Sequence, residues 1–465
     1  MAGTVSTARL VARFLPVGAA LFCIQLDFFS LSLALPSIAA DLGTSTTNLQ
    51  WLMSGYMIAV GALLIPGGRL GDVVGRRAVL LGGIATFGVT SLVCGLASSV
   101  PVLVAARIVQ GAGAAVVLPT AFALVTNATT EEVRPRVIGA LIGIGGVGTA
   151  LGPVVGGVLS SSVSWRWVFL LNVPVAVLAL LGGMRLPESR TGSGPRRIAG
   201  LDWWGVVTVV AGLALISVGI DDVGARGFTS VRTLGALALG VVLLGVFAMI
   251  ETRVAEPLVR PELLRDRAYV VLVVTATLAN IGTVVSILAA TLELQDVRGL
   301  SAATAGLLFF VASVGLAVCG PLSGRLSTRH PAGRIMAVAL LLAAPALALL
   351  AFAGPLPIYA LALALCGITT GMGYSLGELA VQNTLPPERS AEGTSVLLTV
   401  LTAVGGIGVV VASAAIEAVG NQQITSGGIA AVLVAAALLL LLAGLVTALA
   451  ELRAARRSRA SAVTG

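Results

Sequence analysis

The chain has 465 residues, of which 57% are hydrophobic and only 10% are charged, and its mean hydropathy is +1.04. A water-soluble protein this apolar would lack the polar residues that its surface needs, so we expect a polytopic membrane protein. The formal net charge is +8, and the chain contains no lysine. Because a P-loop requires a lysine, ATP-driven transport by this chain alone is excluded.

Neither metal binding nor nucleophilic catalysis is indicated. All four cysteines fall inside apolar runs, where we expect them to be small buried hydrophobic residues. His330, the only histidine, lies in a polar loop beside Arg329. The sequence therefore predicts a protein that is not an enzyme and that has no catalytic residues, no metal and no cofactor.

Fourteen apolar runs follow one another along the chain, and each is expected to form a membrane-spanning helix. The first is too long for the core of a signal peptide and has no small-residue cleavage site, so we expect it to be retained. The predicted fold class is thus an all-α polytopic membrane protein. The runs lie near residues 14–36, 48–67, 78–98, 101–125, 137–160, 167–184, 202–220, 232–251, 268–292, 301–324, 335–353, 356–380, 393–416 and 427–450.

Arginines are divided unequally between the two sets of loops that these helices would create. The set that includes both chain ends carries most of them, and the opposite set carries only Arg166, Arg226, Arg232 and Arg298. By the positive-inside rule, both termini are predicted to be cytoplasmic, in a multi-pass protein of the cytoplasmic membrane. Topology explains the positive charge, so no nucleic-acid partner is expected. The preference for arginine over lysine is typical of a GC-rich bacterial genome.

Asp27 lies in the middle of the first run, between Leu26 and Phe28. An ionised carboxylate facing lipid at that depth would cost several kcal/mol, so Asp27 is expected to face a cavity or a partner. Burial favours the protonated form, which makes Asp27 a candidate for taking up and releasing a proton. The alternative is a structural carboxylate that is hydrogen-bonded within the helix bundle.

A glycine-rich charged stretch follows the second run. It reads Gly68-Arg-Leu-Gly-Asp72-Val-Val-Gly75-Arg76-Arg77, and we expect it to form a short cytoplasmic turn. Topology alone would explain its arginines, but not the ordered pattern G-x-L-x-D-x-x-G-R-R.

Arg107 is the only arginine inside an apolar run. Asp27 lies nine residues before Pro36 on an outward helix, and Arg107 lies six residues after Pro101 on an inward one. At a rise of 1.5 Å per residue, both lie roughly 9–14 Å from the outer helix ends, and therefore at similar depth. Arg107 is the natural partner of Asp27, although the sequence does not show whether the two helix faces meet.

The fifth run contains the stretch Gly148-Thr-Ala-Leu-Gly152-Pro153-Val-Val-Gly156-Gly157. Gly148, Gly152 and Gly156 recur every four residues, so they line one helix face and form a groove that can receive the backbone of a neighbouring helix. Pro153 cannot donate its backbone hydrogen bond, and we expect a bend there. The glycine spacing by itself would indicate only an ordinary tight helix crossing.

The second half of the chain repeats the first faintly, because Gly320–Arg329 after the tenth run resembles Gly68–Arg77, with Gly324 in place of Asp72. The spacing near 250 residues places runs 1–6 and 9–14 in correspondence. Two six-helix halves around a midplane site are the architecture expected of a secondary transporter. The predicted domains are a first half (1–184), a linker with inserted helices 7 and 8 (185–267), a second half (268–452) and a basic cytoplasmic tail (453–465).

Four residues are candidate substrate contacts: Trp51, Tyr56, Gln110 and Glu378. Trp51 and Tyr56 would offer aromatic surface to a hydrophobic molecule, but anchoring at the membrane interface explains Trp51 equally well. Glu378 lies near the cytoplasmic end of the twelfth run. Either it contacts a cation there, or it is a headgroup-level carboxylate that reaches water.

Several of these stretches resemble the motifs of one family. The pattern G-x-x-x-G-P-x-x-G-G in a fifth spanning helix resembles the antiporter motif of drug exporters of the major facilitator superfamily. Leu26-Asp27 followed by Ala34-Leu35-Pro36 is similar to the helix-1 signature of its fourteen-helix drug:proton antiporters. Phe29 and Ser32 depart from that signature, which usually has threonine and asparagine there.

The resemblance extends over most of the first half. The stretch Arg107-Ile-Val-Gln110-Gly111 resembles the helix-4 motif, whose arginine assists proton transfer in the family. Trp165–Pro174 matches the usual start of helix 6, and Gly68–Arg77 resembles the segment that holds the two halves together on the cytoplasmic side. The second half matches mainly by layout and identifies the substrate poorly.

The resemblance implies proton-coupled efflux of hydrophobic small molecules, such as drugs or antibiotics, by alternating access. The proton gradient would drive transport through Asp27 and Arg107, in a monomer whose partners are the substrate, protons and the lipid bilayer. The alternative is a proton symporter or facilitator that imports a small nutrient, against which stand the helix-5 motif and the few polar residues of the second half. A non-transporting receptor or scaffold would need a sizeable soluble domain, for which the sequence gives no sign.

Overall fold

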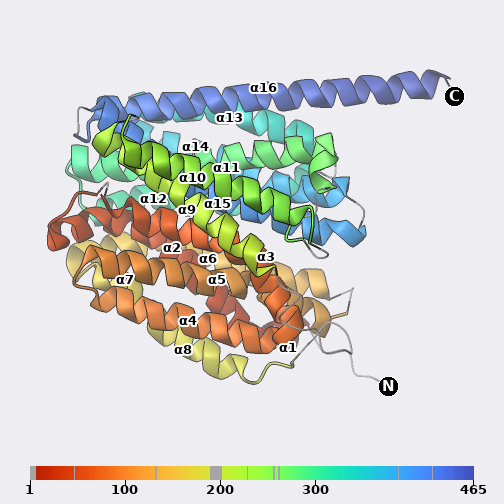
Figure 1. Cartoon of the computed structure of the whole chain (residues 1–465), viewed down its shortest axis with the longest axis horizontal. Helices are drawn as coiled ribbons and strands as arrows, with labels where there is room; N and C mark the ends of the chain where they lie inside the picture. Colours follow the sequence, from red (N-terminus) through yellow and green to blue (C-terminus); the bar gives the residue numbers. More distant parts are fainter. Residues whose placement is uncertain are drawn as a thin grey trace. The chain divides into compact units, whose positions relative to one another are not determined.

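The computed structural model describes residues 7–46, 48–130, 133–188, 202–227, 229–254, 257–259, 262–327, 329–385, 387–420 and 423–464. Within these ranges the chain is helical and contains no strand (Figure 1). The predicted all-α fold is therefore confirmed. The chain divides into two compact units, the first made of Met1–Val259 with Leu300–Leu307, and the second of Arg260–Gly299 with Leu308–Gly465.

The first unit contains the helices of the predicted first half and the two predicted inserted helices. They are α1 (Thr7–Arg13), α2 (Leu15–Leu42), a 3-10 turn (Asn48–Gln50), α3 (Trp51–Val74), α4 (Arg76–Leu96), α5 (Val100–Ala128), α6 (Arg134–Ser162), α7 (Arg166–Leu170), α8 (Asn172–Gly183), α9 (Trp203–Arg226) and α10 (Val231–Glu251). Residues Leu300–Leu307, which include the first turns of α12 (Ala302–Ser327), also belong to this unit.

The second unit contains the remaining helices. They are a 3-10 turn (Leu263–Arg265), α11 (Arg267–Leu292), a π-helical turn (Glu293–Val297), the rest of α12, α13 (Ala332–Phe352), α14 (Leu356–Thr384), α15 (Pro387–Val419) and α16 (Ser426–Thr464). Helix α16 continues over the residues that the sequence analysis assigned to a basic tail.

The number of spanning segments agrees with the sequence. In the part of the chain that the structure describes, 13 helices are long and apolar enough to cross a membrane. A shorter apolar segment, Ala302–Gly315 in α12, corresponds to the remaining predicted run. The chain is a multi-pass membrane protein.

The turn predicted at Gly68–Arg77 is wrong in its extent. Helix α3 continues to Val74, and only Gly75 separates it from α4, with a φ of 125° that favours glycine. The helix persists through this glycine-rich stretch because it packs closely on α5: a Cβ atom at Gly71 would lie 2.6 Å from the side chain of Thr120. Tertiary packing here outweighs the low helix propensity of glycine.

The glycine face of α6 receives the backbone of α2. A Cβ atom at Gly148 would lie 2.5 Å from the carbonyl oxygen of Phe22, and one at Gly152 would lie 2.7 Å from the Cβ atom of Phe29. A Cβ atom at Gly156 would overlap the backbone of Ser30. Only glycine permits this approach, which is the close helix association expected from the four-residue spacing. The groove therefore lies along the segment of α2 that carries Asp27.

Two neighbouring residues of α6 contact α12 instead. A Cβ atom at Gly157 would overlap the backbone of Ala302, and one at Gly306 would lie 2.5 Å from the carbonyl oxygen of Pro153. The stretch Gly148–Gly157 thus holds two close helix crossings on different faces of one helix.

We expect a large side chain in the α2 groove to destabilise the protein. Gly152→Leu should cost about 1–3 kcal/mol or more, because overpacking at a backbone contact forces the helices apart. Gly143→Leu is the matched control, since Gly143 lies on the same helix with no atom within 4 Å of its Cβ position. Thermal unfolding of the purified protein in detergent would measure both. Equal losses from the two substitutions would contradict the role of the groove.

Candidate functional site

Asp27 and Arg107 form an ion pair in the interior of the first unit. Arg107 Nη1 donates to Asp27 Oδ2, and both side chains are 0% exposed. Asp27 comes from α2 and Arg107 from α5. The structure therefore brings together the two charged residues for which the sequence predicted only a similar depth.

The second carboxylate oxygen of Asp27 has two amide partners. Asn172 Nδ2, at the start of α8, donates to Asp27 Oδ1 at 2.9 Å. Gln110 Nε2, one turn after Arg107 on α5, lies 3.3 Å from the same oxygen and also donates to Ser91 Oγ at 2.8 Å. Four helices (α2, α4, α5 and α8) therefore meet in one hydrogen-bonded cluster around a single carboxylate.

Arg107 has further partners that do not depend on Asp27. Its Nε atom donates to the carbonyl oxygen of Leu52 at 3.0 Å, and Nη1 donates to Gln110 Oε1 at 2.6 Å. Its guanidinium carbon lies 4.3 Å from the ring centroid of Tyr56 and 5.8 Å from that of Phe169. These aromatic faces attract a desolvated cation. The guanidinium would thus remain held if Asp27 were neutralised.

The cluster also retains unused hydrogen-bonding capacity. Arg107 Nη2, Asn172 Oδ1 and the hydroxyl of Tyr56 are buried and have no hydrogen-bond partner in the described part of the chain. Burying two charges costs more free energy than their attraction returns unless further hydrogen bonds satisfy them. A buried pair that is incompletely satisfied is weak evidence for a stabilising role and is more typical of a functional site.

The predicted substrate contacts are placed differently from one another. Tyr56 and Gln110 are 4% and 0% exposed and contact the ion pair, so they do not present an open surface. Trp51 is half-buried at the start of α3. Glu378 belongs to α14, but its side chain lies outside the described residues, and so does the side chain of Asp72.

The junction of α3 and α4 is held by contacts within the first unit. Arg76 Nη1 donates to the carbonyl oxygen of Ala123 at 3.2 Å. The backbone N–H of Arg77 donates to Glu188 Oε1 at 3.0 Å, and its side chain lies 3.8 Å from Glu188 Oε2. A Cβ atom at Gly75 would lie 3.0 Å from the same carboxylate, so the Glu188 side chain lies close against this glycine. Glu188, which follows α8, was not identified from the sequence.

Sequence reasoning also missed Asn172 and Ser91. Asn172 carries a signal that could have been used, since it is the single amide in the apolar run that forms α7 and α8. Ser91 carries no such signal, because a helical serine satisfies itself on its own backbone, as Ser91 also does with the carbonyl oxygen of Phe87 at 2.7 Å.

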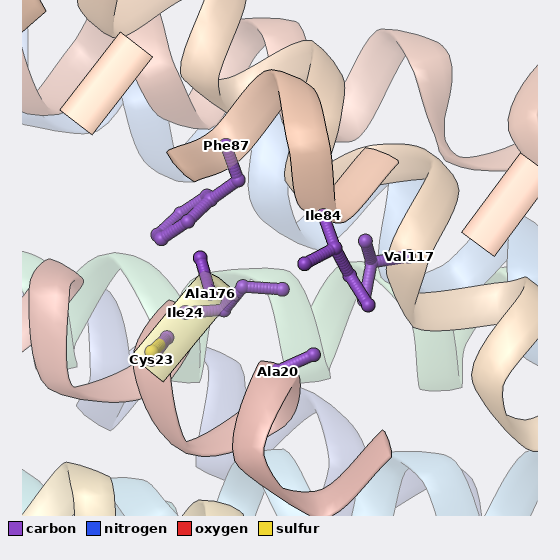
Figure 2. A pocket seen from close by; sticks show the side chains of 7 residues that line it. All are labelled: Ala20, Cys23, Ile24, Ile84, Phe87, Val117 and Ala176. Atoms are coloured by element: carbon purple, nitrogen blue, oxygen red, sulfur yellow. The ribbon is translucent and has the colours of Figure 1, made fainter. Parts of the chain in front are cut away.

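A small apolar pocket lies one helical turn from Asp27. Figure 2 shows its side chains converging from four helices of the first unit. Cys23 joins the pocket to the polar cluster, because its Sγ atom lies 4.0 Å from the carbonyl oxygen of Asn172. Apart from the Cys23 thiol, the lining is entirely hydrocarbon, and it consists of Ala20, Cys23, Ile24, Ile84, Phe87, Val117 and Ala176.

Comparison with known proteins agrees with this architecture. The sequence profile of the Major Facilitator Superfamily matches residues 17–253 and 270–464. The chain belongs to this superfamily. Its members are membrane transporters, and the family expected from the sequence motifs is confirmed.

Similar members of the superfamily include resistance and export proteins. The puromycin resistance protein pur8 of Streptomyces alboniger is 36% identical over 335 residues, which cover 71% of this chain and 66% of that protein. The cephamycin export protein CmcT of Amycolatopsis lactamdurans is 36% identical over 323 residues, which cover 68% of this chain and 66% of that protein. The matched region thus spans slightly less than two thirds of the length of these two relatives.

Solved structures of the superfamily share the fold. A peptide transporter, POT, has a TM-score of 0.71 at 17% identity, covering 97% of this chain and 99% of that one. The nucleoside transporter NupG has a TM-score of 0.68 at 12% identity, covering 94% of this chain and 99% of that one. At these identities the likeness concerns the fold alone.

We expect Arg107→Leu to destabilise the protein by about 3–5 kcal/mol, because it leaves the Asp27 carboxylate buried without a counter-charge. The double variant Asp27→Asn/Arg107→Leu should recover much of this loss, since it removes the uncompensated charge as well. Thermal unfolding of the wild type, both single variants and the double variant completes a mutant cycle. Additive losses would show that the two side chains are not coupled.

Proposed function

We propose that the chain exports hydrophobic small molecules, antibiotics among them, in exchange for protons. The buried Asp27–Arg107 pair is the observation that carries this proposal, because a carboxylate at that depth, beside a counter-charge that has other partners, can bind and release a proton. The resistance and export proteins among the relatives favour this direction of transport and this class of substrate. Proton-driven export needs no cofactor.

Protonation of Asp27 would act first on its contact with Arg107. A proton on Oδ2 would occupy the position at which Arg107 Nη1 now donates. The guanidinium would keep the Leu52 carbonyl, Gln110 and the face of Tyr56. The electrostatic bond between α2 and α5 would therefore break without leaving the cation unsupported. Loss of the proton would restore it, so the two protonation states favour different arrangements of these helices.

The glycine groove would couple the breaking of the Asp27–Arg107 ion pair to the neighbouring helix α6. The backbone of α2 on both sides of Asp27 lies against Gly148, Gly152 and Gly156 of α6. At such a close crossing, α2 cannot shift without displacing α6. In the alternating-access cycle, protonation from outside and proton release inside would thus be coupled to movement of the helices around the substrate path.

We expect Asp27→Asn to abolish export driven by a pH gradient, because asparagine preserves size and hydrogen bonding but cannot titrate. Puromycin is a suitable probe, given the similarity to a puromycin resistance protein. The measurement is drug-induced proton movement in proteoliposomes, with Asp41→Asn as the control because Asp41 is an exposed acid on the same helix. Proton movement at the wild-type ratio to drug in Asp27→Asn would place the carrier elsewhere. Binding of the drug, or its downhill exchange, should survive in Asp27→Asn.

The export direction requires an orientation, and both termini are proposed to be cytoplasmic in a bacterial cell. Single cysteines at positions 3 and 460 should react with a membrane-impermeant reagent only after the cells are opened. The four native cysteines are buried and should contribute little background. Labelling of either position from outside intact cells would reverse the orientation. A cysteine at Arg226, which lies at the predicted outer end of α9, is the positive control.

A further inference from the structure

Helices α9 and α10 pack side by side as a hairpin (Figure 1). Two carboxylates lie at one end of this hairpin. Asp202 immediately precedes α9 and is 6% exposed, and Glu251 ends α10 and is 5% exposed. Both approach the same point beside Gly205: a Cβ atom there would lie 3.2 Å from Glu251 Oε1 and would overlap Asp202 Oδ2. Both oxygens therefore lie within a few ångströms of the same point beside Gly205.

The outer oxygen of each carboxylate is already engaged by the backbone. Asp202 Oδ1 accepts from the N–H of Gly205 at 2.9 Å, and Glu251 Oε2 accepts from the N–H of Val259 at 2.8 Å. Among the residues that the structure describes, the other two oxygens, Asp202 Oδ2 and Glu251 Oε1, are buried and have no hydrogen-bond donor. A single proton placed between these two buried acceptors would give each of them a hydrogen bond.

We propose that Asp202 and Glu251 share a proton and form a second protonation site, separate from Asp27. Two ionised carboxylates at this distance in a buried setting repel each other and leave both oxygens unsatisfied. One proton removes both costs, because the carboxylic acid of one residue then donates to the carboxylate of the other. The site lies at the end of the hairpin that the arginine distribution predicts to be cytoplasmic.

The helix ends decide which residue holds the proton. Asp202 is the N-cap of α9, where the helix dipole and the backbone N–H of Gly205 stabilise a negative charge. Glu251 is the last residue of α10, where the carbonyl end of the helix disfavours a negative charge. The proton therefore resides on Glu251 Oε1, which donates to Asp202 Oδ2.

Arg69 connects this site to the α3–α4 junction. It is the cation that acts on Glu251, and its Nη2 atom donates to the carbonyl oxygen of Pro257, in the segment that follows α10. In the described residues, the groups that face Glu251 are thus Asp202 from α9, Arg69 from α3 and the backbone N–H groups of Leu258 and Val259. Loss of the shared proton would place a second negative charge beside Arg69. The charge of the Asp202–Glu251 pair would therefore change the electrostatic interaction with Arg69 near the end of α3.

The other end of the same hairpin provides a matched control. Asp222 is 7% exposed, but it is paired with Arg226, lies 3.9 Å from the Nε atom of Arg232, and accepts from Thr233 Oγ1 at 2.9 Å. The carboxylate oxygens of Asp222 thus have cationic partners and a hydroxyl donor, which Asp202 Oδ2 and Glu251 Oε1 lack.

Infrared spectroscopy of the full purified chain would test the site directly, with an Asp27→Asn background so that Asp27 contributes no signal. A carboxylic acid C=O band should be present near neutral pH, shift in deuterated water, and disappear in Glu251→Gln. The band should remain in Asp222→Asn. In Asp202→Asn the amide can donate to Glu251, so the band should disappear at lower pH than in the parent.

Three outcomes would overturn the proposal. They are a parent spectrum without the band, a band that survives Glu251→Gln, and a band of unchanged pH dependence in Asp202→Asn. The Asp202→Asn result also stands if Glu251→Gln fails to fold. Stoichiometric binding of Mn²⁺ to chelator-treated protein, lost in Glu251→Gln, would show a cation site in place of the shared proton. None of these measurements requires transport, so they succeed or fail independently of the exporter function.

Discussion

The burial of Asp27 against Arg107 is the constraint on which the rest of the first unit depends. Neither charge is tolerable alone in the spanning core, and together they still need the amides of Gln110 and Asn172, the carbonyl of Leu52 and the face of Tyr56. These groups come from α3, α5 and α8, so satisfying one ion pair constrains how α2, α3, α5 and α8 pack. In the proposed cycle, the Leu52 carbonyl, Gln110 and the face of Tyr56 would hold Arg107 after its release from Asp27.

Close helix packing at glycines is the second constraint on the first unit, and these glycines lie near the charged residues. The α6 glycines lie against the segment of α2 that carries Asp27, and Gly71 and Gly75 allow α3 and α4 to approach α5 and Glu188. In lipid there is no hydrophobic gain from bringing helices together, so contact between backbones supplies the association. The helix that carries Asp27, α2, is therefore packed against α6 without intervening side chains.

The carboxylates at the two ends of the α9–α10 hairpin have different partners. At one end of the α9–α10 hairpin, Asp222 is matched by two arginines and a threonine. At the other end, Asp202 and Glu251 each have a buried oxygen without a donor among the described residues, and they lie at helix ends of opposite dipole. The charged side chains of this apolar hairpin thus lie at its two ends. The end with Asp202 and Glu251 is the one beside Arg69 of α3.

The sequence by itself determined the fold class, the spanning helices and the family. Hydrophobic length and glycine spacing are properties of one segment, and the apolar length of a segment decides whether it spans the bilayer as a helix. It also placed Asp27 and Arg107 at one depth. Only the tertiary structure decided that they touch, that Gln110 and Tyr56 serve the ion pair, and that Asn172, Ser91 and Glu188 complete the contacts. It likewise replaced the predicted turn at Gly68–Arg77 with a helix broken only at Gly75. The reason is the same in each case: which face of a helix meets which neighbour depends on packing between segments far apart in sequence, and no local pattern encodes that.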